Sequence, residues 1–178
     1  MPVQCFVMVL IIIFLYSLKM KRAVFPGSFD PFTTAHREIV RNAYPFFDIT
    51  ILICSNGNKN SGMFNIDERK EMIQNAIGKS DTVRVDVCNG LLTDYCKQFD
   101  IEYVIRGIQY KNVAEELDLA HIYYEDQRLE TVFFPTYKPE LEHVSSTRVR
   151  EYIKYNGFWE SCVPQDNINF IQTWIQRH

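Results

Sequence analysis

Short apolar runs alternate with longer amphipathic stretches from Lys21 to the end of this chain, and this alternation constrains the fold most. The runs are rich in Val, Ile, Thr, Phe and Tyr, which is typical of β-strands. These strand-like runs are residues 22–25, 48–54, 82–88, 102–105 and 130–134. The helical stretches between and after them are about 35–47, 65–77, 91–99, 113–128, 146–155 and 165–177. We therefore predict one α/β domain over residues 20–178, an open parallel sheet of about five strands with helices on both faces.

Two of the predicted helices carry clear sequence signals. In the first, Ile39, Val40 and Ala43 share one apolar face. In the second, Asn65 is a candidate N-cap and Glu68 follows three residues later, which is the spacing of a capping box.

The composition limits the classes of protein to which this chain can belong. A chain of 178 residues with 47% hydrophobic content can bury one sizeable core. The net charge of -3 and the pI of about 5.8 give no general electrostatic basis for binding nucleic acid, so any anion site must be local. Five scattered cysteines without a C-x-x-C motif indicate neither a disulfide framework nor a zinc site, and suggest the reducing cytoplasm.

The N-terminal segment contains an unbroken apolar run over residues 5–16. This run is shorter than the roughly 20 residues of a membrane span, and no Lys or Arg precedes it as in a signal peptide. We interpret residues 1–19 as an upstream extension of the reading frame and expect no membrane association. A real anchor or uncleaved signal, or an additional packed strand or helix, are the alternatives.

Ligands of open parallel sheets bind beyond the carboxyl ends of the strands. The first such loop, 26–36, reads PGSFDPFTTAH. Gly27 allows close approach of a ligand, Thr33 or Thr34 can cap the next helix, and His36 lies in its first turn, near the N–H groups that suit phosphate. The plain alternative is a tight turn with His36 at the surface or the edge of the core.

Other loops add groups that bind anions. Arg106 ends a strand and precedes Gly107, where a guanidinium can contact phosphate; a salt bridge to an acidic residue is its alternative. The hydroxyls of residues 145–147 start another helix and can bind phosphate or only cap it. Lys59 can reach a ligand from a Gly- and Asn-rich loop, or be solvated.

Several common catalytic signatures do not occur in the sequence: the G-x-x-x-x-G-K-S/T, G-x-G-x-x-G, H-E-x-x-H and G-x-S-x-G motifs. The remaining set of a His, an Arg, hydroxyls and helix N-termini suits phosphoryl or nucleotidyl transfer. In such a reaction the substrate supplies the nucleophile, while the protein positions it and stabilises charge.

The motifs AVFPGSFDPFTTAH, YVIRGI and VSSTRVRE, in this order and with NGLLTDY between them, resemble those of the phosphopantetheine adenylyltransferases. These enzymes belong to the nucleotidylyltransferase superfamily with its T-x-G-H motif. The resemblance covers residues 20–178. It implies a Rossmann-like fold, a cytoplasmic homo-oligomer (often a hexamer), and a Mg²⁺-dependent reaction of ATP with 4'-phosphopantetheine that gives dephospho-coenzyme A and pyrophosphate.

The resemblance also implies roles for individual residues. His36 would be catalytic and would bind ATP phosphate, and no protein residue is expected as a dedicated metal ligand. The other residues expected to bind ATP are Ser28, Phe29, Gly107, Ile108, Gln109, Glu116, Leu141, Glu142, His143, Val144, Ser145, Ser146 and Thr147. The residues expected to bind phosphopantetheine are Ser28, Lys59 or Asn60, Leu92 and Arg106.

Three positions depart from the family pattern. Ala35 replaces the glycine of T-x-G-H, which a helix start tolerates unless the backbone needs positive φ. Gln109 stands where an arginine is usual, and the lysine of the substrate loop aligns with Asn60, one residue after Lys59.

Other functions are open at this stage. A related enzyme could adenylylate nicotinate mononucleotide or cytidylylate a small alcohol phosphate, since these share the first motif. A membrane-associated nucleotide-binding protein, anchored by residues 5–18, is an alternative of another class.

Overall fold

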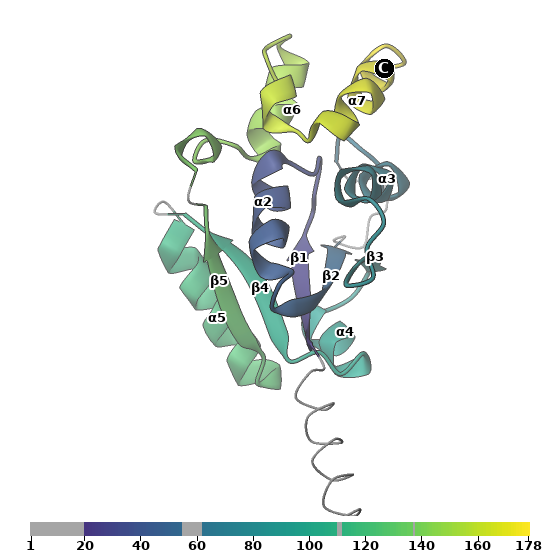
Figure 1. Cartoon of the computed structure of the whole chain (residues 1–178). Coiled ribbons are helices and arrows are strands. Elements are labelled where there is room, and N and C mark those ends of the chain that lie inside the picture. The colour runs from purple at the N-terminus through teal and green to yellow at the C-terminus, as the bar shows by residue number, and fades with distance from the viewer. Residues whose placement is uncertain (1–19, 55–61, 110–111, 137) are drawn as a thin grey trace, which may run out of the picture.

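The computed structural model describes residues 20–54, 62–109, 112–136 and 138–178, and its centre is a five-stranded parallel sheet (Figure 1). The strands are β1 (Lys21–Gly27), β2 (Phe47–Cys54), β3 (Val83–Cys88), β4 (Tyr103–Ile108) and β5 (Glu130–Pro135). Their order is β3-β2-β1-β4-β5. The predicted open parallel sheet is confirmed, whereas the interpretation of residues 1–19 concerns a part of the chain outside the described residues.

Six α-helices are present in the described ranges. They are α2 (Thr34–Ala43), α3 (Ile66–Ile77), α4 (Leu92–Gln98), α5 (Val113–Gln127), α6 (Ser146–Lys154) and α7 (Ile168–Ile175). Two predicted helix bounds were wrong by three or more residues. The first helix ends at Ala43 instead of 47, because Phe47 begins β2 and pairs with Lys21 of β1. The last begins at Ile168, after a 3₁₀ turn at Gln165–Asn167.

The sheet buries both of its faces. Along β1, Ala23 and Phe25 belong to the core on one face, together with Ile39 and Val40 of α2 and buried residues of α3. Val24 belongs to the core on the other face, which α4 and α5 cover. This alternation follows from the two-residue period of a strand, and it fixes α2 directly over the middle of the sheet.

A third apolar cluster lies beyond the carboxyl ends of the strands, where Figure 1 shows α6 and α7. Val149 of α6 and Ile171 of α7 pack there with Ala35 of α2 and Met72 of α3. This packing places the start of α6 against the β1–α2 loop. No helix in the described part of the chain is both long enough and apolar enough to cross a membrane.

Candidate active site

A pocket of about 350 Å³ opens at the carboxyl ends of β1 and β4. Here the chain order of the strands reverses, because β2 and β3 lie to one side of β1 and β4 and β5 to the other. Open α/β sheets bind ligands at such a switch point. The pocket brings together ten of the predicted site residues: Ser28, Phe29, His36, Arg106, Gly107, Gln109, Glu116, Val144, Ser145 and Ser146.

Thr33 is the N-cap of α2, and His36 completes the cap. The Thr33 hydroxyl accepts a hydrogen bond from the backbone N–H of His36 at 3.4 Å. In return, the Thr33 backbone N–H donates to Nδ1 of His36 at 3.1 Å. Since Nδ1 accepts this bond, the neutral ring carries its hydrogen on Nε2. Thr34, the other predicted cap, donates its hydroxyl to the Cys162 carbonyl instead, at 3.1 Å.

Three phenyl rings surround the imidazole of His36. The ring centroids of Phe25, Phe29 and Phe32 lie 6.1, 5.1 and 5.5 Å from its own. Burial, with a smaller contribution from the positive charge of Arg106, lowers the pKa of His36 to about 4. The site therefore holds a neutral imidazole at pH 7, and its chemical capacity is to donate a hydrogen bond from Nε2.

Arg106 forms a bidentate ion pair with Glu116. Its Nε and Nη2 donate to the two carboxylate oxygens at 2.6 and 2.9 Å. Burial alone would lower the pKa of Arg106, but the hydrogen bond and charge of Glu116 raise it above its usual value. The salt bridge considered as an alternative for Arg106 is thus present, inside the pocket where a phosphate was expected.

Asn112 extends this network, and sequence reasoning missed it. Its side-chain amide donates to Glu116 at 3.3 Å, and its Oδ1 accepts from the backbone N–H of Gln109 at 2.7 Å. Its position just before α5, three residues after Gln109, was the available signal. Thr136, Phe25 and Ile39 also line the pocket, but in the sequence the last two look like ordinary core residues.

The hydroxyls at the start of α6 already have protein partners. Ser145 is the N-cap and accepts from the Arg148 N–H at 3.2 Å. Ser146 donates its hydroxyl to the Pro31 carbonyl at 2.8 Å, so that hydrogen is engaged inside the protein. The Ser145 hydroxyl therefore caps α6, and the Ser146 hydroxyl connects α6 to the β1–α2 loop.

Ala35 lies in the first turn of α2, where the residue is 7% exposed and helps to line the pocket. Its φ is not positive, unlike that of Phe29 at 47°. The glycine of the T-x-G-H pattern is therefore not required by this backbone. At Gly107, by contrast, a Cβ would lie 2.3 Å from Cδ1 of Ile39, so the Ile39 side chain would have to move to admit a larger residue.

The remaining predicted residues do not line this pocket. Leu92 begins α4 and packs into the core on the face that α4 and α5 cover. Lys59 and Asn60 are outside the described residues. The others are Ile108, Leu141, Glu142, His143 and Thr147, all next to pocket residues or close to them in sequence.

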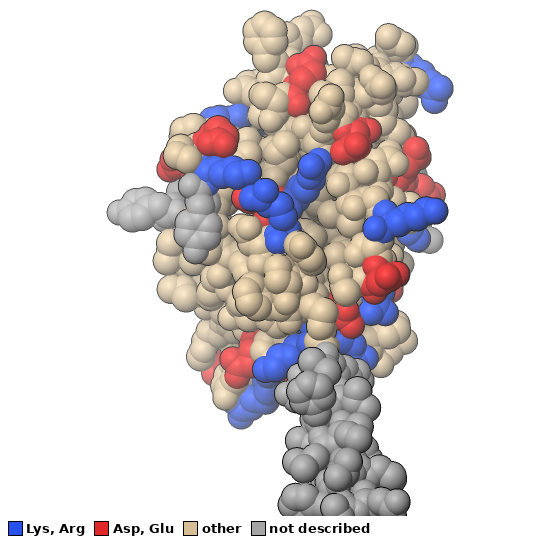
Figure 2. Space-filling model, in the orientation of Figure 1, with Lys and Arg blue, Asp and Glu red and all other residues tan. Residues whose placement is uncertain are grey.

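Several Lys and Arg side chains lie on the surface over α2, and Arg37, Arg41 and Lys138 each have a carboxylate partner. Figure 2 shows Lys and Arg side chains gathered over α2, the helix that carries Arg37 and Arg41. Lys138 approaches the same helix through an ion pair with Glu38, at 3.2 Å. Among the described residues, no group of three or more His, Cys, Asp or Glu side chains could hold a metal ion.

The cytidylyltransferase-like family model matches residues 24–152. The phosphopantetheine adenylyltransferase of Cytophaga hutchinsonii is 36% identical over 150 residues, which are 81% of this chain and 97% of that protein. That of Bacteroides fragilis is 39% identical over 148 residues, 82% and 97% of the two chains. Among solved structures, Plasmodium falciparum nicotinic acid mononucleotide adenylyltransferase is 12% identical with a TM-score of 0.62, covering 88% of this chain and 96% of its own, which supports the fold.

Proposed function

This chain belongs to the phosphopantetheine adenylyltransferases, within the cytidylyltransferase-like family of nucleotidyltransferases, and on that premise we propose its reaction, substrates and site residues. It transfers the adenylyl group of ATP to 4'-phosphopantetheine and releases pyrophosphate, giving dephospho-coenzyme A. One observation carries the proposal: Ser28, His36, Arg106 and the N-terminus of α6 meet in a single pocket.

The reaction proceeds by in-line attack of a phosphate oxygen of 4'-phosphopantetheine on the α-phosphorus of ATP. The new P–O bond forms as the bond to pyrophosphate breaks, without a covalent enzyme intermediate. His36 donates from Nε2 to the oxygens on which negative charge grows, and the Ser28 hydroxyl and the N–H groups at the start of α2 assist it. Preorganised donors of this kind act by stabilising the transition state.

The pocket residues divide between the two substrates. ATP lies against the β1–α2 loop, residues 107–109, Glu116 and the segment 141–147. Arg106 contacts the phosphate of 4'-phosphopantetheine. It either releases Glu116 or donates hydrogen bonds to the carboxylate and the phosphate at the same time. Leu92 and Lys59 or Asn60 bind the rest of the molecule. Mg²⁺ enters with ATP as part of that substrate and neutralises charge on its phosphates.

The enzyme acts in the cytoplasm as a homo-oligomer. The free thiols of Cys54, Cys88, Cys96 and Cys162 are consistent with a reducing compartment. Exposed apolar side chains on α5, among them Leu117 and Ile122 at 53% and 56% exposure, support association between copies of the chain.

Pyrophosphate release from purified protein tests the proposal. We expect release with ATP and 4'-phosphopantetheine, but not with ATP and nicotinate mononucleotide or with CTP and a small alcohol phosphate. His36→Ala removes the neutral donor, so turnover should fall by about 10²- to 10³-fold. His121→Ala is the matched control, since His121 lies on α5 with its side chain 70% exposed. A folded His36→Ala protein with wild-type turnover contradicts the assigned role, and preference for another acceptor contradicts the proposed substrate.

A further inference from the structure

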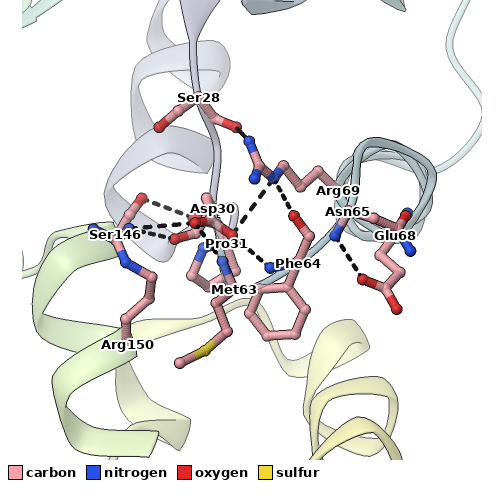
Figure 3. Close-up of polar contacts among 10 residues, drawn as sticks. All are labelled: Ser28, Asp30, Pro31, Met63, Phe64, Asn65, Glu68, Arg69, Ser146 and Arg150. Atoms are coloured by element: carbon pink, nitrogen blue, oxygen red, sulfur yellow. Dashed lines mark hydrogen bonds and ion pairs between the residues drawn. The ribbon is translucent and has the colours of Figure 1, made fainter. Parts of the chain in front are cut away.

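Two side chains of α6 hold the backbone of the β1–α2 loop. Arg150 Nη1 donates to the Asp30 carbonyl at 2.6 Å, and the Ser146 hydroxyl donates to the Pro31 carbonyl at 2.8 Å (Figure 3). Residues four apart lie on one face of a helix, so the two contacts act together. They fix the first turn of α6 against the loop that carries Ser28.

The segment leading into α3 holds the same loop from another side, through the Asp30 carboxylate. This carboxylate accepts from the backbone N–H groups of Met63 and Phe64 at 3.0 and 2.9 Å (Figure 3). Arg69 Nε lies 3.4 Å from its Oδ1, and Arg69 Nη1 donates to the Ser28 carbonyl at 3.3 Å. The side chains of Asp30 and Arg69 are only 7% and 5% exposed.

These contacts surround a residue with an unfavourable backbone conformation. Phe29 lies between the held residues Ser28 and Asp30, and its φ of 47° is in the left-handed region. A non-glycine residue keeps that conformation only where its surroundings enforce it. The conformation matters for the site, because the Phe29 ring is buried and packs edge-on against the imidazole of His36.

We propose that Asp30, Arg69 and Arg150 form a positioning clamp for the nucleotide site, an inference that rests on the proposed function. The clamp sets Ser28 and His36 on one side, and the N-terminus of α6 on the other, at the separation that the phosphates of ATP require. None of the three residues lines the pocket, so we assign them a positioning role that acts through the loop.

Arg150 is the clamp residue best suited to a test. Its side chain is 32% exposed and it lies 3.8 Å from the Asp30 carboxylate, so its removal leaves the buried pair of Asp30 and Arg69 in place. Arg37→Ala is the matched control. It removes a guanidinium from α2 that pairs with Asp166 at 3.3 Å, and both of these side chains are about half exposed.

The experiment compares wild type, Arg150→Ala, Arg150→Lys and Arg37→Ala by steady-state kinetics for each substrate, by calorimetric titration with ATP, and by thermal unfolding. For Arg150→Ala we expect kcat/KM for ATP to fall by about 10- to 100-fold, because small misplacements of a positioned substrate have effects of this size. ATP affinity should fall with it, while KM for 4'-phosphopantetheine changes less than about twofold. Arg150→Lys should recover part of the loss, and Arg37→Ala should match wild type.

The clamp is refuted if Arg150→Ala folds and keeps the wild-type affinity and kcat/KM for ATP. It is also refuted if kcat/KM falls equally for both substrates while the affinity for ATP is unchanged. Asp30→Asn gives a second measurement through a double-mutant cycle. Its effect on ATP affinity should not add to that of Arg150→Ala, since both variants loosen the same loop. Titration with ATP needs no acceptor, so a wild-type protein that binds ATP but does not use 4'-phosphopantetheine refutes the proposed function and still tests the clamp.

Discussion

The neutral state of His36 makes the stability of this protein depend on pH in a defined direction. In the unfolded chain a histidine titrates near 6.5, whereas burial among three phenyl rings lowers the pKa of His36 to about 4 in the fold. Between these values the unfolded chain binds a proton that the folded chain does not. The contribution of His36 is therefore fully present above pH 6.5 and is lost as the pH falls toward 4.

The difference in pKa sets the size of this effect. At about 1.4 kcal/mol for each pH unit, a fall from 6.5 to about 4 corresponds to about 3 kcal/mol of unfolding free energy. This value is an upper limit, because the imidazole forms part of the pocket wall and solvent there screens some of the charge. A loss of this size is a large part of the 5–15 kcal/mol by which typical domains are stable.

Denaturant unfolding of wild type and His36→Asn between pH 4 and 7.5 measures the effect. Carboxylates titrate in the same range in both proteins and cancel in the difference between the two curves. We expect wild type to lose up to about 3 kcal/mol more than the variant on acidification. NMR titration of the histidines gives a direct check, since the His36 resonance should titrate near 4. A constant difference across the range, or a His36 resonance that titrates near 6.5, refutes the reasoning.

Two further predictions concern the walls of the pocket. Arg106→Ala should raise KM for 4'-phosphopantetheine more than it lowers kcat, because the charge meets a phosphate already present in the ground state; an unchanged KM in a protein that is folded by circular dichroism contradicts that assignment. Ala35→Gly should destabilise the protein by about 1–2 kcal/mol, through lost helix propensity and a lost buried methyl group, with turnover within a few-fold of wild type. Unfolding by urea checks the second prediction, and a more stable glycine variant would show that Ala35 strains the helix start.

The sequence predicted the sheet well because each strand is a short run of β-branched and aromatic residues between helical stretches. The capping box of Asn65 and Glu68 was also readable, since its spacing is local, and the structure contains it. The ends of the elements were predicted less accurately where apolar residues continue from one element into the next. Phe47 was predicted to end a helix, but it is the buried first residue of β2.

The site was predicted less completely because its contacts join residues far apart in the chain. Arg106 was singled out, but sequence alone did not decide between a phosphate and an acidic residue as its partner. His36 was expected to face an anion, yet its part in the cap of Thr33 was not foreseen, although the T-x-x-H spacing matches a capping box with His in place of Glu. Asp30 lies in the loop for which a tight turn was the plain alternative, and its contacts with Met63 and Phe64 follow only from the fold.

The ion pair of Arg106 and Glu116 has a consequence for selectivity. The Glu116 carboxylate already accepts hydrogen bonds from Nε and Nη2 of Arg106, so a phosphate that approaches these N–H groups must displace this internal anion or share the donors with it. A lone inorganic phosphate gains little by this exchange, because one anion replaces another of similar geometry. A ligand that is also bound elsewhere in the pocket presents its phosphate at high effective concentration and wins the competition. If Arg106 binds the substrate phosphate as proposed, Glu116 competes for its N–H groups and disfavours small anions more than the larger substrate.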